Sequence, residues 1–232
     1  MFFTKRLLAI AVIAATAALA QPFTYLNLAA ADAELIGISG TETLTVGGPP
    51  ITPPGTTHFI DFFPFADNSD TLLVGDGTSP TRYNQFYSFT YEVMNGAAIG
   101  SVGIVLQGVL GGSGFISFTE DVFALDGFGG EFLIGSLGNG LRRTGTTDPV
   151  GSLSFNGANF TYTENGVLDY GVTHYKVKKT FFLMVDPTNF DPTRDYAGIS
   201  LIQQAHIVPE PATITATIVG LAALAARRRR KS

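Results

Sequence analysis

Apolar and polar residues alternate with period two along most of the chain. The clearest stretch runs from Tyr87 to Val93, where aromatic or aliphatic side chains alternate with Ser88, Thr90 and Glu92. This pattern predicts a strand with one buried face. The same reasoning predicts strands at 41–46, 101–110, 115–118, 132–134, 152–155, 159–163, 175–178, 180–185 and 199–207. No run shows a convincing apolar stripe at helical spacing.

Asn-Gly pairs and proline clusters separate the predicted strands. Asn95-Gly96, Asn139-Gly140, Asn156-Gly157 and Asn165-Gly166 have the residue types that tight hairpin turns need. Asn156-Gly157 is the best hairpin prediction, because a predicted strand flanks it on each side. The two Asp-Pro-Thr triplets, at 186–188 and 191–193, predict a loop.

Many short strands divided by turns predict an all-β fold, an antiparallel β-sandwich that is jelly-roll-like, over residues 21–207. The chain has 19 Phe and no Trp. Phe and Tyr bury about 150–250 Å² each, so we expect most of them in the core. An exposed aromatic platform for sugar rings is the alternative.

Composition narrows the possible functions. The chain has no Cys, which excludes disulfides, cysteine-based zinc sites and thiol catalysis. The net charge is −5, but residues 21–208 hold 18 acidic and seven basic residues, a balance of −11. An acidic body repels phosphate backbones, so no nucleic-acid partner is expected.

Residues 1–20 have the pattern of a signal peptide. Lys5 and Arg6 precede an apolar run from Leu7 to Ala20, and Ala18 and Ala20 give the small-x-small pattern of a cleavage site. Ala31 and Ala33 are later candidates for the cleavage site. An uncleaved anchor is the alternative, although the run is short for a membrane span.

The C-terminal residues 208–232 contain three parts in order. Pro209, Glu210 and Pro211 come first, and an uncharged 15-residue run, Ala212 to Ala226, follows. A helix of that length covers about 22 Å, less than the ~30 Å hydrocarbon core of a bilayer. The basic cluster Arg227, Arg228, Arg229, Arg230 and Lys231 would remain cytoplasmic.

This tail resembles the PEP-CTERM sorting signal of exported bacterial proteins. Pro209, Glu210 and Pro211 match its motif, and Arg227 to Arg230 match its cytoplasmic stop. Three threonines make the helix less apolar than is usual in that family. The resemblance implies processing by signal peptidase and an exosortase, transient membrane anchoring, and a final place at the cell surface or in the exopolysaccharide matrix of a Gram-negative-type bacterium. A plain C-terminal anchor is the alternative.

No catalytic motif is recognisable in the body, and no enzyme activity or cofactor is expected. Ser39 and Ser113 lie between glycines and are interpreted as turn residues. His58 lies near Asp61, and His174 occupies the polar side of a predicted strand. Neither histidine has a partner at a spacing that indicates a catalytic dyad.

Carboxylates are the abundant functional groups. Glu120, Asp121 and Asp126, or Glu92 with Glu131, could form an acid–base pair, but we interpret them as solvated surface acids. The oxygen-rich run 67–70 with Asp76 could bind calcium, although it is not an EF-hand and a polar turn is the simpler interpretation.

These observations predict a non-catalytic structural or adhesive β-sandwich at the cell surface, associated with exopolysaccharide. A carbohydrate-binding module, with or without calcium, is the alternative. An extracellular hydrolase is a third hypothesis, and it would need two carboxyls about 5–10 Å apart in a cleft.

Overall fold

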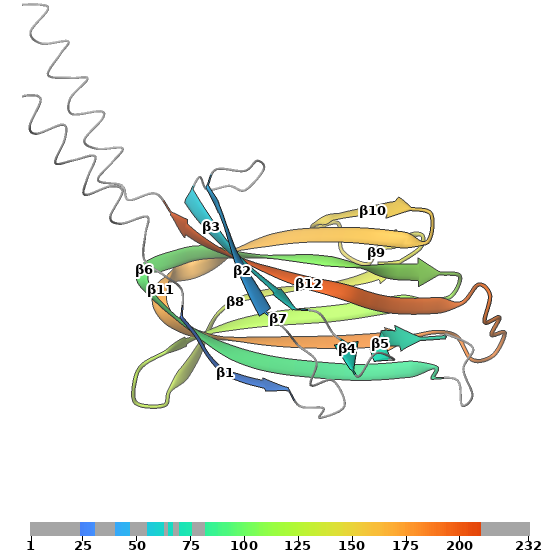
Figure 1. Ribbon diagram of the computed structural model, residues 1–232, viewed down its shortest axis with the longest axis horizontal. Coiled ribbons are helices and arrows are strands. Elements are labelled where there is room, and N and C mark those ends of the chain that lie inside the picture. The colour runs from blue at the N-terminus through green and yellow to red at the C-terminus, as the bar shows by residue number, and fades with distance from the viewer. Residues whose placement is uncertain are drawn as a thin grey trace, which may run out of the picture.

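The computed structural model describes residues 24–30, 40–46, 55–62, 65–66, 70–75 and 82–209. Every regular element in these ranges is a β-strand (Figure 1). The strands are β1 Thr24–Ala30, β2 Gly40–Val46, β3 Gly55–Phe62, β4 Phe65–Ala66, β5 Asp70–Val74, β6 Asn84–Gly111, β7 Phe115–Leu125, β8 Glu131–Arg142, β9 Gly145–Thr146, β10 Ser152–Asn156, β11 Asn159–Met184 and β12 Tyr196–Pro209. The described residues contain no helix long and apolar enough to span a bilayer.

Two long strands, β6 and β11, connect the layers of the fold. The first half of each strand pairs antiparallel with the second half of the other, so the two strands pair over almost their whole length. The 84–94 half of β6 and the 174–184 half of β11 continue into a layer with β1, β7 and β8. The other halves continue into a layer with β10, β12, β3 and β2. The prediction of an antiparallel all-β fold is therefore confirmed, with one curled sheet providing both layers.

Period-two alternation sets which side chains lie between the layers. Tyr87, Phe89, Tyr91 and Val93 of β6 are all at most 1% exposed, and Phe86 on the opposite face is 60% exposed. Aromatic side chains fill much of the space: Phe89 lies 5.0 Å from Phe62 of β3, measured between ring centroids. The expectation that most aromatics form the core is confirmed for these residues.

Only one of the four predicted Asn-Gly hairpins exists. Asn156-Gly157 joins β10 to β11, and Gly157 has a φ of 62°, which favours glycine. The predictions for Asn95-Gly96, Asn139-Gly140 and Asn165-Gly166 are wrong, because these pairs lie inside β6, β8 and β11. The pairing of β11 with β6 shifts register after Val167, where β11 passes from one layer to the other. The Asn165-Gly166 pair therefore lies next to a bend within the strand and not in a hairpin turn.

The helices expected at the two ends lie outside the described residues, as do Ala18, Ala20, Glu210, Pro211, Arg227, Arg228, Arg229 and Arg230. Pro209 is the last residue of β12 and pairs with Gly55 of β3. The residues matching the sorting motif therefore begin where the sheet ends.

Candidate functional site: a polar pocket at one end of the sandwich

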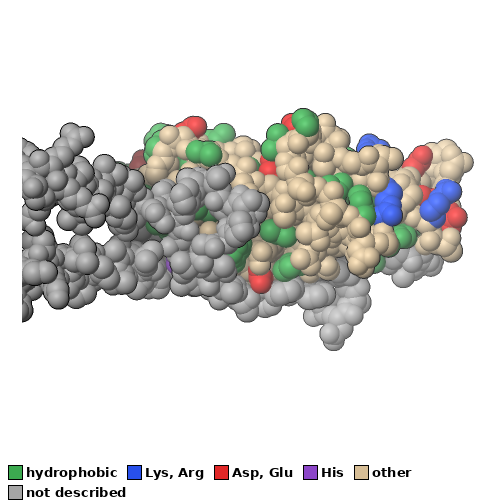
Figure 2. All heavy atoms as spheres, turned by 90° about the horizontal axis from the view of Figure 1, so that it is seen from above, with side chains coloured by type: hydrophobic (Ala, Val, Ile, Leu, Met, Phe, Trp, Pro, Cys, Tyr) green, Lys and Arg blue, Asp and Glu red, His purple; other side chains and the backbone are tan. Residues whose placement is uncertain are grey.

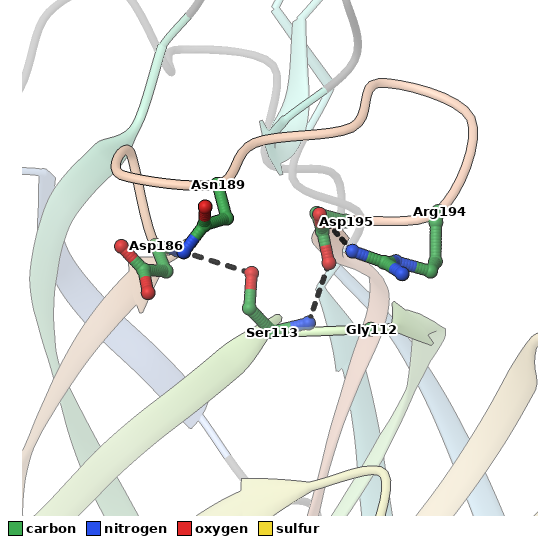
Figure 3. Close-up of a pocket in the computed structure, with 6 residues that line it drawn as sticks. All are labelled: Gly112, Ser113, Asp186, Asn189, Arg194 and Asp195. Atoms are coloured by element: carbon green, nitrogen blue, oxygen red, sulfur yellow. Dashed lines mark hydrogen bonds and ion pairs between the residues drawn. The ribbon is translucent and has the colours of Figure 1, made fainter.

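A polar pocket of about 380 Å³ lies where two connections meet at one end of the sandwich. The β6–β7 turn provides Gly112 and Ser113, and the β11–β12 loop provides Asp186, Asn189, Arg194 and Asp195 (Figure 3). Asn189 and Asp186 lie on one side of Ser113, and Arg194 and Asp195 lie on the other. In Figure 2 the basic side chains, with several acidic ones, gather toward the right-hand end of the molecule.

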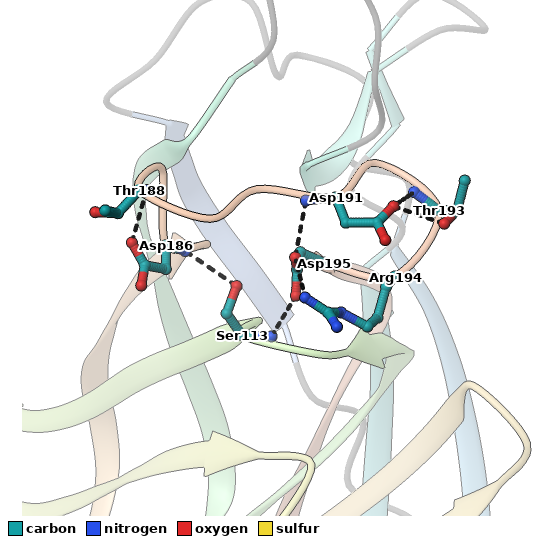
Figure 4. Close-up of polar contacts among 7 residues, drawn as sticks. All are labelled: Ser113, Asp186, Thr188, Asp191, Thr193, Arg194 and Asp195. Atoms are coloured by element: carbon teal, nitrogen blue, oxygen red, sulfur yellow. Dashed lines mark hydrogen bonds and ion pairs between the residues drawn. The ribbon is translucent and has the colours of Figure 1, made fainter.

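The two Asp-Pro-Thr triplets shape the β11–β12 loop in the same way. The Asp186 carboxylate accepts a hydrogen bond from the Thr188 backbone N–H at 2.8 Å. The Asp191 carboxylate accepts hydrogen bonds from the Thr193 N–H at 2.9 Å and from its hydroxyl at 2.6 Å (Figure 4). Each aspartate thus closes a local turn, with the intervening proline fixing φ. The predicted loop is confirmed.

Asp195 fixes the loop to the β6–β7 turn. Its carboxylate accepts hydrogen bonds from the N–H of Ser113 at 2.8 Å and from the N–H of Asp191 at 2.9 Å. These two bonds, with a smaller effect of the Arg194 guanidinium, lower the pKa of Asp195 to about 2. Gly112 has a φ of 49° and no room for a Cβ beside the Asp195 carboxylate. A glycine is therefore required at this close approach.

The pocket retains polar groups that its own structure does not consume. Asp195 is 2% exposed and committed to the backbone. The Arg194 side chain is 64% exposed, and within the described residues its guanidinium contacts only Asp195, with Nη2 3.4 Å from the carboxylate. Asn189 and the second carboxylate oxygen of Asp186 have no hydrogen bond among the described residues. Hydrogen-bond donors and acceptors therefore face the same small space.

One residue of an aromatic pair belongs to the loop that lines the pocket. Phe190 follows Asn189 in the loop, and its ring makes an edge-to-face contact with Tyr83 at 5.2 Å between centroids. The Tyr83 carbonyl accepts a hydrogen bond from the Val185 N–H at 2.9 Å, which ties the start of β6 to the end of β11. Tyr83 is 38% exposed. The other aromatics exposed in the described part of the chain come from separate places: Phe86 in β6, Phe128 and Phe132 around the β7–β8 turn, and Tyr170 in β11.

The carboxylates singled out from the sequence do not form an acid–base pair. Glu120 is fully buried and contacts the Lys179 amine, so its interpretation as a surface acid is wrong. Asp121 accepts a hydrogen bond from the Ser136 hydroxyl at 2.7 Å. Asp126 closes the β7–β8 turn through the Phe128 and Gly130 N–H groups, which lower its pKa. Each acid thus has a separate structural partner.

Glu92 and Glu131 are also separated. Glu131 Oε1 lies 2.8 Å from Lys176 Nζ. Glu92 Oε2 lies 3.6 Å from His174 Nε2, and Glu92 pairs in register with Lys176. These groups form alternating charges on the outer face of β6, β11 and β8. They therefore provide no cleft with two free carboxylates.

The histidine near Asp61 lies in the core. His58 of β3 is 5% exposed and pairs in register with His206 of β12. The Tyr175 hydroxyl lies 2.8 Å from His206 Nδ1. Burial, and to a smaller extent the charges of Lys179 and His58, lower the pKa of His206 well below its usual value. His206 is thus a neutral core group at neutral pH.

Several predicted residues are beyond the described ranges. Ser39, the run 67–69 and Asp76 lie outside them, and only the backbone of Asp70 is described, in β5. The calcium hypothesis therefore remains a prediction. Among the residues that are described, no group of three or more His, Asp and Glu could hold a metal ion.

Sequence reasoning identified Ser113 only as a turn residue and missed Asp186, Asn189, Arg194 and Asp195 as a group. The repeated Asp-Pro-Thr triplet was the available signal, because it marks a loop with a fixed shape. The sequence contains nothing that brings the Gly112-Ser113 turn to that loop, 82 positions before Asp195.

Comparison with known proteins gives distant likenesses only. No family model and no curated protein matches the chain. Among solved structures, a carbohydrate-binding module, TmCBM61 in complex with β-1,4-galactotriose, aligns at a TM-score of 0.29 and 10% identity, covering 79% of this chain and 87% of that one. The enzymatically active domain of tailspike protein 4 of bacteriophage CBA120 aligns at 0.27 and 10% identity, covering 80% of this chain, which spans 19% of that one. The Eiger TNF of S. frugiperda aligns at a TM-score of 0.27 and 9% identity, covering 81% of this chain and 94% of that one. Likenesses at these TM-scores carry no inference about a ligand.

Proposed function

We propose that this chain is an exported, non-catalytic β-sandwich protein of the cell surface or extracellular matrix that binds carbohydrate in the loop pocket. The observation that carries the proposal is the set of polar groups around one space: the second carboxylate oxygen of Asp186, the Asn189 amide and the Arg194 guanidinium, which is exposed although it contacts Asp195 at 3.4 Å. Carboxylate, amide and guanidinium groups match the alternating donors and acceptors of sugar hydroxyls. The pocket volume lies within the usual range for small ligands, about 300–1,000 Å³.

Charge favours a neutral sugar. Three aspartates and one arginine surround the pocket and its loop, and residues 21–208 carry a balance of −11. Repulsion would weaken the binding of uronate or sulfate groups, most strongly at low ionic strength. Tyr83, which is 38% exposed and contacts Phe190 of the β11–β12 loop, offers an apolar surface to a sugar ring face.

A hydrolase receives no support from this pocket. A glycosidase needs one carboxylic acid that stays protonated near neutral pH. The pKa of Asp195 is about 2, so this group is ionised and cannot donate a proton. Asp186 is exposed and already accepts one backbone hydrogen bond.

Export is supported by the two chain ends. The signal-peptide pattern and the tail that resembles PEP-CTERM imply transfer of the body across the inner membrane and processing by signal peptidase and an exosortase. The last fully buried residue of β12 is Ile207, and the strand ends at Pro209. Removal of the residues that follow the motif would therefore leave the described core complete. The jelly-roll-like topology stays a prediction.

The function is tested by retention of the chain in native gels that contain neutral or acidic polysaccharides. We expect retention by neutral polysaccharides, and we expect Asn189→Ala to weaken it about 10-fold or more, as the loss of one or two hydrogen bonds implies. Asn159→Ala, an exposed position in β11 outside the pocket, is the matched control. Retention by no polysaccharide would leave only a structural or adhesive role, and equal retention of both variants would place binding elsewhere.

A further inference from the structure

Three polar side chains lie together in the apolar core between the layers. Lys179 of β11, Glu120 of β7 and Gln204 of β12 are each 0% exposed. Lys179 occupies an inward position between Val177 and Phe181, which are also fully buried. A charged lysine at such a position requires a specific explanation, because burying an ammonium costs several kcal/mol even when it is paired.

The three groups form a closed set of contacts. The Lys179 amine contacts one oxygen of the Glu120 carboxylate and also the side-chain carbonyl oxygen of Gln204. The Gln204 amide nitrogen donates to the other Glu120 oxygen at 2.8 Å. The amine therefore lies next to the carboxamide carbon, and one carboxylate contacts both the amine and the amide nitrogen.

The environment favours an uncharged amine. Burial lowers the pKa of Lys179, and the charge of Glu120 only partly opposes this effect. A desolvated, neutral lysine is a competent nucleophile. A carboxylate that contacts both nitrogens can take a proton from one and give a proton to the other.

We propose that Lys179 and Gln204 form an intramolecular isopeptide bond, with Glu120 as the proton-transfer group. The bond would join β11 of one layer to β12 of the other. This inference does not depend on what the loop pocket binds.

The reaction balances without an oxidant or a co-reactant. Glu120 first takes the extra proton of the lysine ammonium. The neutral Nζ attacks Cδ of Gln204, forming the Nζ–Cδ bond, and Nζ loses one proton as the Cδ–Nε2 bond breaks. Glu120 relays a proton to Nε2, which leaves as ammonia. The products are a secondary amide, free ammonia and a protonated Glu120, so no charge remains in the core.

Such a bond would serve the purpose that disulfides serve in other exported proteins. The chain has no Cys, and Lys179 and Gln204 are 25 positions apart in sequence. Closing this loop restricts the unfolded chain. It would also replace a buried ion pair by a neutral amide.

The test is the mass of the purified full chain. An isopeptide bond removes ammonia, so the intact mass falls about 17 Da below the mass calculated from the sequence. Cyclisation of Gln21 after signal cleavage would remove the same mass, so the bond must be located by digestion. Trypsin cannot cleave after a linked Lys179, and we expect residues 179–194 joined to residues 195–227. An unlinked Lys179 would be cleaved, so finding residues 180–194 and 195–227 as separate, unmodified peptides would overturn the proposal.

Two variants separate the roles of the residues. Glu120→Gln keeps Lys179 and Gln204 but removes the proton-transfer group, and we expect loss of the linked peptide. Lys178→Met changes the exposed neighbour in β11 and should retain the link. A link that persists in Glu120→Gln would overturn the role of Glu120. A loss of about 18 Da with Lys179 joined to the peptide that holds Glu120 would show a different bond and overturn the assignment to Gln204.

Discussion

At the scale of single residues, four aspartates among the described residues hold backbone in place. Asp126, Asp186 and Asp191 close turns through neighbouring N–H groups, and Asp195 joins two connections that are far apart in sequence. The first three could have been expected, since aspartate in a Gly- or Pro-rich stretch favours such turns. The role of Asp195 could not, because its partner Ser113 is distant in the chain.

The low pKa of Asp195 predicts a pH-dependent stability. Its folded-state pKa is about 2 and its usual value is 3.8, so the ionised group stabilises the fold above about pH 4. This contribution is lost as the pH falls from about 4 to 2. We expect Asp195→Asn to lower Tm by a few degrees at pH 7, and the difference from wild type to shrink between pH 4 and pH 2. Thermal unfolding followed by circular dichroism measures it.

Asp169→Asn, an exposed position in β11, serves as the control and should follow the wild type at every pH. A Tm difference for Asp195→Asn that stays constant down to pH 2 would contradict the role given to the Asp195 hydrogen bonds.

At the scale of elements, period-two alternation predicted strands such as 87–93 and 180–185 because one face of each is buried. It did not predict their length: 84–111 and 159–184 are continuous strands that pass from one layer to the other. An Asn-Gly pair favours the same backbone conformations in a strand bend as in a hairpin turn. Only tertiary pairing, here between β6 and β11 on both sides of the bend, distinguishes the two.

The two faces of β6 predict mutational effects of very different size. Phe89 is 1% exposed and packs against Phe62 and Tyr91, and Phe86 is 60% exposed. Phe89→Ala should lower the free energy of unfolding by about 3–5 kcal/mol, through lost burial and the cavity left behind. Phe86→Ala should lower it by about 1 kcal/mol or less. Urea denaturation measures both, and similar losses would show that the inward face of β6 is assigned wrongly.

At the scale of the whole molecule, the architecture explains how the two layers hold together in a chain that has no Cys. A chain without Cys holds two layers together through aromatic packing and two strands that both layers share. The buried set of Lys179, Glu120 and Gln204 could not have been predicted from sequence, because β7, β11 and β12 meet only in the folded state. Alternation would have placed Lys179 inward, next to Val177 and Phe181, but a lysine normally argues for the outer face.

The loop pocket can meet an extracellular polysaccharide only if the body is exported, so delivery across the membrane is the central claim. It is tested most directly by the intact mass of the form recovered from the native cell surface or medium. We predict a chain that lacks residues 1–20 and ends at or near Pro209–Pro211. A form that retains residues 212–232 would show that the tail is a lasting membrane anchor, and it would contradict the surface or matrix location.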